Sequence, residues 1–218
     1  NYKRRKNIIW LKRIMKKVSI MQPNIFMWCG LLKTIIESDI HIILDCVKSS
    51  KNSRYNRNRI AGKGKTTWLT IPFKDFHRDK IIGEQILDTS LSVQKKLHDM
   101  FLMRYAHTKY FSNAKYVLTA TLAQESSRTL LKAVYSSYLD SLRSLGLPIG
   151  ETVFASELIK KEDLYNLKGI ELVNHLLHKV NGSTYLTAEN TDNYANPNEY
   201  NIKDVYIQRF ISFPYIQV

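Results

Sequence analysis

The chain has 218 residues, a formal net charge of +14 and 44% hydrophobic residues, a composition typical of a soluble folded domain. Its apolar runs end well before the roughly 18–20 residues that a membrane-spanning helix requires, so no transmembrane segment is predicted. The two cysteines, Cys29 and Cys46, are typical of a reduced protein and not of a disulfide scaffold, so we expect a cytoplasmic location.

Residues 1–14 carry six basic side chains and no acidic one. The sequence Met15-Lys16-Lys17 has the character of a bacterial N-terminus that runs directly into a strand. We therefore expect residues 1–14 to be a basic N-terminal extension outside the core, and residues 15–218 to form a single α/β domain. The alternative for residues 1–14 is a basic amphipathic helix that makes peripheral contact with an anionic membrane.

Along the rest of the chain, short apolar stretches alternate with stretches of helical periodicity. Strands are predicted at residues 18–21, 40–47, 66–73, 81–87, 151–158 (ending in a turn), 185–186 and 205–210. Helices are predicted at residues 26–37, 91–105, 115–145 and 163–180, and a polar loop at residues 48–65. Ser126-Ser127 could divide the third of these helices. The alternation predicts an α/β fold with a mainly parallel sheet flanked by helices, and with a helical segment around 91–145.

Polar side chains stand at the ends of several predicted strands. Ligands of parallel sheets bind beyond the carboxyl ends of the strands. Gln22 follows the first predicted strand, and Asp45 lies near the end of the second. Ser156 and Glu157 end a later one. These four residues are therefore candidates for a binding or catalytic site.

The positive charge is concentrated in the first part of the chain, because residues 81–218 contain equal numbers of basic and acidic side chains. Residues 48–65 contain no acid and seven basic residues: Lys48, Lys51, Arg54, Arg57, Arg59, Lys63 and Lys65. Arginine binds phosphate through two parallel hydrogen bonds, and lysine adds point charge. This segment is either a phosphate-binding loop or a solvated basic surface. Asn56 and Asn58 either contact the ligand or brace a turn, and Trp68 is either a core residue or a stacking platform.

The candidate chemistry rests on two carboxylates. Asp45 could act as a general base whose pKa is raised by burial, or as an anchor for the arginine cluster. Glu157 could act as an acid or base, or start a helix. Cys46 could be a reactive thiolate beside the basic loop, but we expect a plain buried cysteine. Ser156 lacks the context of a serine nucleophile, and the histidines form no ligand cluster, so no metal site is predicted.

Several motifs recur together in one known family. They are Met21-Gln22-Pro23, Asn-Arg-Asn-Arg-Ile at 56–60, Trp-Leu-Thr-Ile-Pro at 68–72, Ser156-Glu157-Leu158, Tyr185-Leu186-Thr187-Ala188 and Pro214-Tyr215-Ile216-Gln217. In this respect the chain resembles the WbqC-like family, which is associated with bacterial O-antigen and surface-polysaccharide gene clusters. Cys46 stands where the family has a second Asp, and Ala188 where it has a Gly. Members usually continue beyond the last motif, so the resemblance implies a chain truncated at its C-terminus.

The resemblance implies a function as well as a fold. It implies an acyl- or aminoacyl-transferase, with glycyl as one proposed group, that acts on an amino sugar or its sugar nucleotide. The substrate would contact residues of these motifs and of the basic loop: Gln22, Asn56, Arg57, Asn58, Arg59, Lys65, Trp68, Ser156, Tyr185, Tyr215 and Gln217.

Such a transferase needs an activated acyl donor. The sequence leaves three donors open: a thioester on an acidic acyl carrier protein, an acyl-adenylate, or a coenzyme A thioester. The alternative function is a non-catalytic basic binding or scaffold protein of the polysaccharide pathway or of a nucleic acid. Nucleic acid is the less favoured partner, because residues 81–218 are neutral and no RNA-binding signature is present.

Overall fold

The computed structural model describes residues 16–50, 53–61, 66–160, 162–163, 166–188 and 196–208. The expectations for residues 1–14, Lys65, Tyr215 and Gln217 lie outside the described residues. The chain forms two compact units. Of the described residues, unit 1 comprises 16–21, Trp28–Leu44 and those between 150 and 208, and unit 2 comprises Gln22–Met27 and those between 45 and 149.

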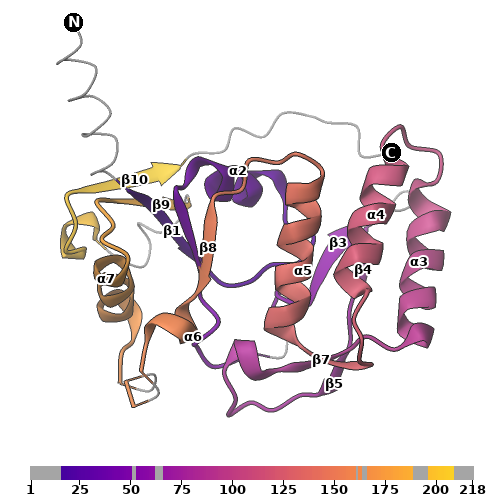
Figure 1. The fold of residues 1–218 in the computed structure, drawn as a ribbon, viewed down its shortest axis with the longest axis horizontal. Helices are drawn as coiled ribbons and strands as arrows, with labels where there is room; N and C mark the ends of the chain where they lie inside the picture. The colour runs from indigo at the N-terminus through magenta and orange to yellow at the C-terminus, as the bar shows by residue number, and fades with distance from the viewer. Residues whose placement is uncertain are drawn as a thin grey trace, which may run out of the picture. The chain divides into compact units, whose positions relative to one another are not determined.

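Unit 1 contains a five-stranded sheet in which all neighbouring strands are parallel (Figure 1). Its strands are β1 (Lys17–Met21), β2 (Ile40–Ile43), β8 (Glu151–Phe154), β9 (Thr184–Ala188) and β10 (Asp204–Gln208). Their order is β10-β9-β1-β2-β8. The predicted α/β fold with a mainly parallel sheet is therefore confirmed. Strand β2 is buried at every position, as expected for a strand covered on both faces.

The helices of unit 1 connect its parallel strands. They are α2 (Cys29–Glu37), α6 (Ala155–Leu158) and α7 (Gly169–Lys179), with a short 3-10 helix, η3, at Pro197–Glu199. Gln208 at the end of β10 ties that strand to α2, because its amide nitrogen donates to Glu37 Oε2 at 2.7 Å and its amide oxygen accepts from Thr34. From β1 the sheet grows in two directions, so its topological switch point lies between β1 and β9.

Unit 2 contains two small antiparallel sheets and three longer helices. A two-stranded ribbon pairs β3 (Arg57–Ile60) with β4 (Thr67–Thr70), and a three-stranded sheet contains β5 (Phe73–Asp75), β6 (Ile86–Asp88) and β7 (Arg128–Leu130). The 3-10 helix η1 (Ile82–Glu84) precedes β6, and the helices are α3 (Leu91–Tyr105), α4 (Phe111–Leu122) and α5 (Leu131–Ser144). The predicted helical segment around 91–145 is thus confirmed, with β7 inside it.

The predicted helix at 115–145 is divided around Ser126-Ser127, the division that the sequence left open. Helix α4 ends at Leu122, and α5 begins only after β7. The Thr89 hydroxyl donates to the carbonyl of Ser126, and the Thr89 amide donates to the carbonyl of Ser127 at 3.0 Å. These bonds hold the two serines beside β6, and β7 then completes the sheet. Tertiary hydrogen bonds override the helical periodicity at this position.

The predicted loop at 48–65 is wrong in part, because β3 lies within its second half. Only the two-stranded pairing reveals this strand, since its sequence is too polar to be recognised by hydrophobic periodicity. Other predicted elements are shorter than expected. Strand β2 ends at Ile43, because the following backbone pairs with the η1 segment: Gly83 N donates to the Asp45 carbonyl at 2.9 Å, and Ile82 N donates to the Val47 carbonyl at 3.0 Å.

Two predicted strands and one predicted helix are corrected in a similar way. The strand at 66–73 is divided into β4 and β5 around Pro72, which has no backbone N–H for a ladder. The strand at 81–87 begins as η1 and becomes a strand only at Ile86. The helix at 163–180 begins at Gly169, whose φ of +53° interrupts a helical path from the preceding residues.

Candidate functional site

Side chains of the β3–β4 ribbon lie on two opposite faces. Successive residues of a strand point to opposite sides, and Asn58 and Ile60 are buried while Arg59 is exposed. Across the ribbon, Arg59 is paired with Trp68 and Arg57 with Thr70. One face of the ribbon therefore presents the two arginines next to an indole and a hydroxyl.

Three guanidinium groups gather around the Trp68 ring. The distances from the ring centroid to the guanidinium carbon are 4.4 Å for Arg57, 5.3 Å for Arg59 and 5.9 Å for Arg54. Among the described carboxylates, none lies within ion-pair distance of Arg54 or Arg59. We call Arg54, Arg57, Arg59 and Trp68 the basic face. The indole attracts each cation, but it supplies no countercharge, so the basic face is suited to an anion.

The two asparagines of the motif brace the ribbon from its buried side. Asn56 Nδ2 donates to the Ile71 carbonyl at 2.9 Å, and Asn58 Nδ2 donates to the Phe26 carbonyl at 2.7 Å. Asn58 Oδ1 also accepts from the Arg59 amide at 2.8 Å. Both side chains are thus turned inward, in agreement with the bracing alternative. A direct contact with substrate stays a prediction for Asn56 and Asn58.

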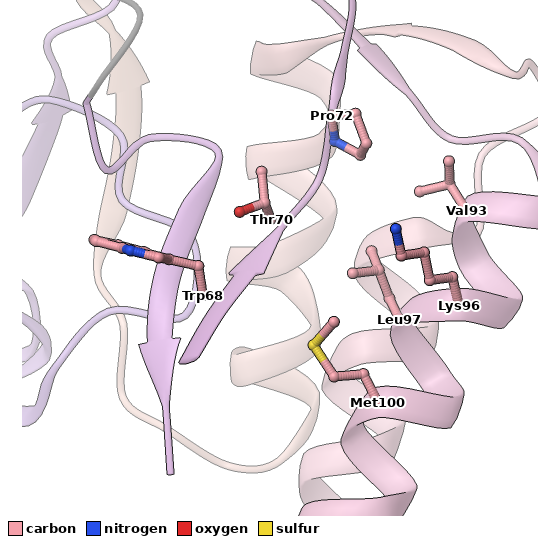
Figure 2. Close-up of a pocket in the computed structure, with 7 residues that line it drawn as sticks. All are labelled: Trp68, Thr70, Pro72, Val93, Lys96, Leu97 and Met100. Atoms are coloured by element: carbon pink, nitrogen blue, oxygen red, sulfur yellow. The ribbon is translucent and has the colours of Figure 1, made fainter. Parts of the chain in front are cut away.

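A pocket of about 320 Å³ lies between β4 and α3. Figure 2 shows Lys96, Leu97 and Met100 extending from α3 toward β4. The full lining comprises Trp68, Thr70, Pro72, Val93, Lys96, Leu97 and Met100. The walls are mainly apolar, with one lysine and one hydroxyl as hydrogen-bond donors, which is the usual make-up of a small-molecule site. Trp68 belongs to both the pocket lining and the basic face, so the two adjoin, and Figure 2 shows the Trp68 ring directed away from α3.

Asp45 belongs to the same unit as the basic face, but its side chain is completely buried. It is packed against Gly83, where a Cβ atom would overlap the Asp45 carboxylate. A general base must meet its substrate, and a carboxylate with no exposed surface does not do so in this conformation. The burial indicates a structural environment for Asp45, and its role as an anchor for the arginines stays a prediction. Its catalytic role stays a prediction.

Cys46 is a buried thiol and not a reactive thiolate. Burial, and then the neighbouring Asp45 charge, raise the pKa of Cys46 from 9.0 to about 12. The thiol is therefore protonated at neutral pH and is a poor nucleophile. The expectation of a plain buried cysteine agrees with this environment, in which the basic loop does not activate the sulfur.

The remaining predicted site residues lie on different elements. Glu157 is exposed and Ser156 half-buried on α6 of unit 1, and Gln22 is exposed directly after β1. Tyr185 is buried in β9, where its ring lies 5.1 Å from the ring of Tyr200, and burial raises the pKa of Tyr185 to about 12. Tyr185 therefore packs as a core residue, and little of its surface is left for a sugar.

The structure thus brings Arg57, Arg59 and Trp68 together. It adds Lys96 and Met100 to their surroundings, although sequence reasoning did not select either of them. Both lie in a different predicted element from the basic loop, and no spacing rule connects that helix to the ribbon. Arg54 is one of the seven basic residues of the segment 48–65. Only its distance to the Trp68 ring identifies it as part of the basic face.

Two further properties follow from the part of the chain that the structure describes. No group of three or more His, Cys, Asp or Glu side chains is placed there to hold a metal ion. No helix within these described ranges is both long and apolar enough to cross a membrane.

The chain is similar to a family model and to a curated relative. The model of the WbqC-like protein family matches residues 22–218. The uncharacterized protein Rv1507c of Mycobacterium tuberculosis is 36% identical over 77 residues, which are 34% of this chain and 32% of the relative. The match thus spans about a third of the relative's length. No solved structure matches the chain at a significant level.

Proposed function

The chain belongs to the WbqC-like protein family, and from this premise we propose that it binds a nucleotide-linked amino sugar and transfers an acyl or aminoacyl group to it. The process would be bacterial O-antigen or surface-polysaccharide biosynthesis. The observation that supports the proposal most directly is the basic face, where three guanidinium groups surround one indole. The transfer step and the pathway rest on the family resemblance.

The basic face is suited to the diphosphate of such a ligand. Arg57 and Arg59 project from the same side of one strand, and each can form two parallel hydrogen bonds to phosphate oxygens. A charge-assisted hydrogen bond typically contributes about 1.5–3 kcal/mol. Two such bonds would contribute a large part of a micromolar affinity, which corresponds to about 8 kcal/mol.

The pocket beside the basic face is suited to the nucleoside. Its apolar walls, Leu97 and Met100 among them, can pack against a flat base. Lys96 has donors and no acceptor, so it matches the carbonyl oxygens of a base. The ligand would thus extend across β4, with its phosphates over the arginines of β3 and its nucleoside toward α3.

The transfer itself would form a C–N bond and break the bond between the acyl carbon and its leaving group. The amine of the sugar attacks the carbonyl carbon of a carrier-protein thioester, an acyl-adenylate or a coenzyme A thioester. The thiolate or AMP leaves with the electron pair of the broken bond, and a base accepts the amine proton. Glu157 and Asp45 are the carboxylates proposed from the sequence for this proton. Glu157 is exposed and Asp45 is buried.

The decisive experiment is a calorimetric titration of the full chain with UDP-, dTDP- and GDP-linked amino sugars, followed by mass spectrometry of the sugar after incubation with each class of donor. We expect binding of a nucleotide-linked sugar, much weaker binding of pyrophosphate and of the free amino sugar, and the mass increase of an acyl group on the sugar. Failure of every nucleotide-sugar to bind would contradict the proposal at its first step.

The second candidate function is a non-catalytic binding or scaffold protein of the same pathway or of a nucleic acid. Two observations favour it. The Asp45 side chain is buried, and neither β3 nor β4 contains an acidic residue. In that case polyanions or a partner protein would stabilise the chain in thermal-shift measurements. Sugar nucleotides would stabilise it no more than pyrophosphate does, and no acyl product would form.

A further inference from the structure

The turn between α3 and α4 exposes an unusual amount of apolar surface. Figure 1 shows the two helices side by side as a hairpin. Near the turn, the exposed fractions are 49% for Leu102, 81% for Met103, 66% for Tyr110 and 44% for Tyr116. Single exposed apolar residues are common on protein surfaces, but here four large ones occur on the two sides of one turn, and exposed apolar surface of this kind marks interaction sites. We call these four residues the hairpin tip.

The surroundings of the hairpin tip are basic. Residues 100–124 contain no Asp or Glu, and they contain Arg104, Lys109 and Lys115. Lys109 and Lys115 are exposed, and the Lys109 ammonium lies 5.2 Å from the centre of the Tyr110 ring. Positive charge and exposed apolar groups therefore occur on the same segment, and the acid that precedes it is the exposed Asp99, one helical turn before Met103.

The exposure of the hairpin tip is built into the fold. On the inner side of the hairpin, the Phe101 ring lies 4.7 Å from the Tyr105 ring and is stacked 6.0 Å from Phe111. The Tyr105 hydroxyl accepts a hydrogen bond from the Ala61 amide at 2.7 Å, and Arg104 donates to the Ala61 carbonyl at 3.1 Å. Because these contacts fix the last turn of α3, its outward residues cannot rotate inward to bury themselves.

We propose that the hairpin tip docks the protein onto the surface of an anionic lipid bilayer. The aliphatic side chains of Leu102 and Met103 enter the boundary between headgroups and acyl chains, the position that apolar residues of interfacial helices occupy. Tyr110 and Tyr116 lie at headgroup level, where tyrosine is enriched. Lys109 and Lys115 face the phosphates of anionic lipids.

A bilayer matches both properties of the surface, and other partners match only one. Nucleic acid would satisfy the lysines, but it offers no apolar medium to Leu102 and Met103. A second copy of the chain would cover the apolar groups, but it would bring two segments of the same charge together. This inference does not depend on the proposed nucleotide-sugar activity, because it uses none of the residues of the basic face.

The test is co-sedimentation of the full chain with vesicles of phosphatidylcholine alone and of phosphatidylcholine with about 30% phosphatidylglycerol. We expect binding to the anionic vesicles only, and weaker binding as salt is raised. Met103→Glu should lower the partition coefficient by about tenfold or more, because a charged side chain replaces an inserted apolar one. Leu91→Glu is the matched control, since Leu91 is also 81% exposed but lies about 18 Å away at the other end of α3.

A chain without residues 1–14 must retain the binding, which separates the hairpin tip from the basic N-terminal segment. The melting temperature of each variant shows that the comparison is made between folded proteins. Absence of binding to anionic vesicles overturns the proposal, as does an equal loss in Met103→Glu and Leu91→Glu. It is also overturned if Met103→Glu dissociates an oligomer in sedimentation velocity, or if it weakens binding to RNA or an acidic protein while vesicle binding is unchanged.

Discussion

The guanidinium carbon of Arg57 lies 4.4 Å from the centre of the Trp68 indole, and the two residues belong to neighbouring strands of one ribbon. The indole thus contributes to setting the position of the Arg57 guanidinium. Arg57 Nε also donates to the Ser53 carbonyl at 3.3 Å, which restrains the guanidinium from its other side. An arginine held in this way loses less entropy when it binds an anion.

This relationship predicts the effect of changing either residue. Arg57→Ala should weaken the binding of a nucleotide-linked sugar by about 1.5–3 kcal/mol, or roughly 10–150-fold, because a charge-assisted contact is lost. Trp68→Leu should weaken the same binding by about 0.5–2 kcal/mol through the loss of the cation–π contacts. Isothermal titration calorimetry measures both changes.

Arg78→Ala is the control for these variants, because Arg78 is an exposed arginine of the same unit outside the ribbon. As a screened surface charge it should change the affinity by less than about 1 kcal/mol. Equal losses at Arg57 and Arg78 would show that the basic face acts only through net charge.

We predict that position 83 requires a glycine, because its backbone lies against the Asp45 carboxylate. A Cβ atom at this position overlaps the Asp45 carboxylate, so Gly83→Ala should lower the free energy of unfolding by about 1–3 kcal/mol, as overpacking does in other buried sites. The double variant Gly83→Ala/Asp45→Ala relieves the overlap. Its destabilisation should therefore be smaller than the sum of the two single effects, and urea denaturation of all three variants measures this coupling. Additive effects would mean that the two residues do not press on each other.

The Cys46 thiol predicts how stability depends on alkaline pH. The pKa of Cys46 is raised from 9.0 to about 12 in the folded state, so the unfolded chain loses this proton first as the pH rises. Between these two values the folded state binds more protons than the unfolded state, and the free energy of unfolding falls by about 1.4 kcal/mol for each pH unit from this group. Cys46→Ala removes the contribution. We expect thermal melts from pH 8 to 11 to show a smaller fall in the melting temperature for this variant than for the wild type.

The same thiol predicts a difference in reactivity. Cys46 is buried while Cys29 is exposed, so one of the two cysteines should react with a thiol reagent at pH 8 in the native state and both should react in denaturant. Rapid native labelling of Cys46, identified by peptide mass spectrometry, would contradict the buried environment.

The two carboxylates should respond differently to amide substitution. If Glu157 accepts the amine proton, Glu157→Gln lowers the transfer rate by about 10²–10⁴-fold while the melting temperature stays unchanged, because the residue is exposed. Asp45→Asn changes a fully buried side chain, so it should lower the melting temperature as well. Mass spectrometry of the acylated sugar and thermal denaturation separate the two effects. A fully active, less stable Asp45→Asn variant identifies Asp45 as an anchor, and an inactive variant of normal stability identifies it as the base.

The sequence alone determined the class of fold and the composition of the basic segment. Mainly apolar runs such as Ile40–Ile43, separated by helical periodicity, are enough to indicate buried parallel strands, because both properties depend on local spacing. The cluster of cations at 48–65 and the motif residues around it are also properties of the sequence itself. These features led to Arg57, Arg59 and Trp68 as candidate site residues.

Only the tertiary structure decided which of these residues meet. The pairing of Arg59 with Trp68 depends on a register between two strands, and the polar sequence of β3 carries no periodic signal for a strand at all. The entry of Lys96 into the pocket depends on how α3 packs beside β4, and the buried Asp45 lies against Gly83, which is distant from it along the chain. Local sequence patterns encode the elements, whereas a site is made by contacts between residues that are distant along the chain.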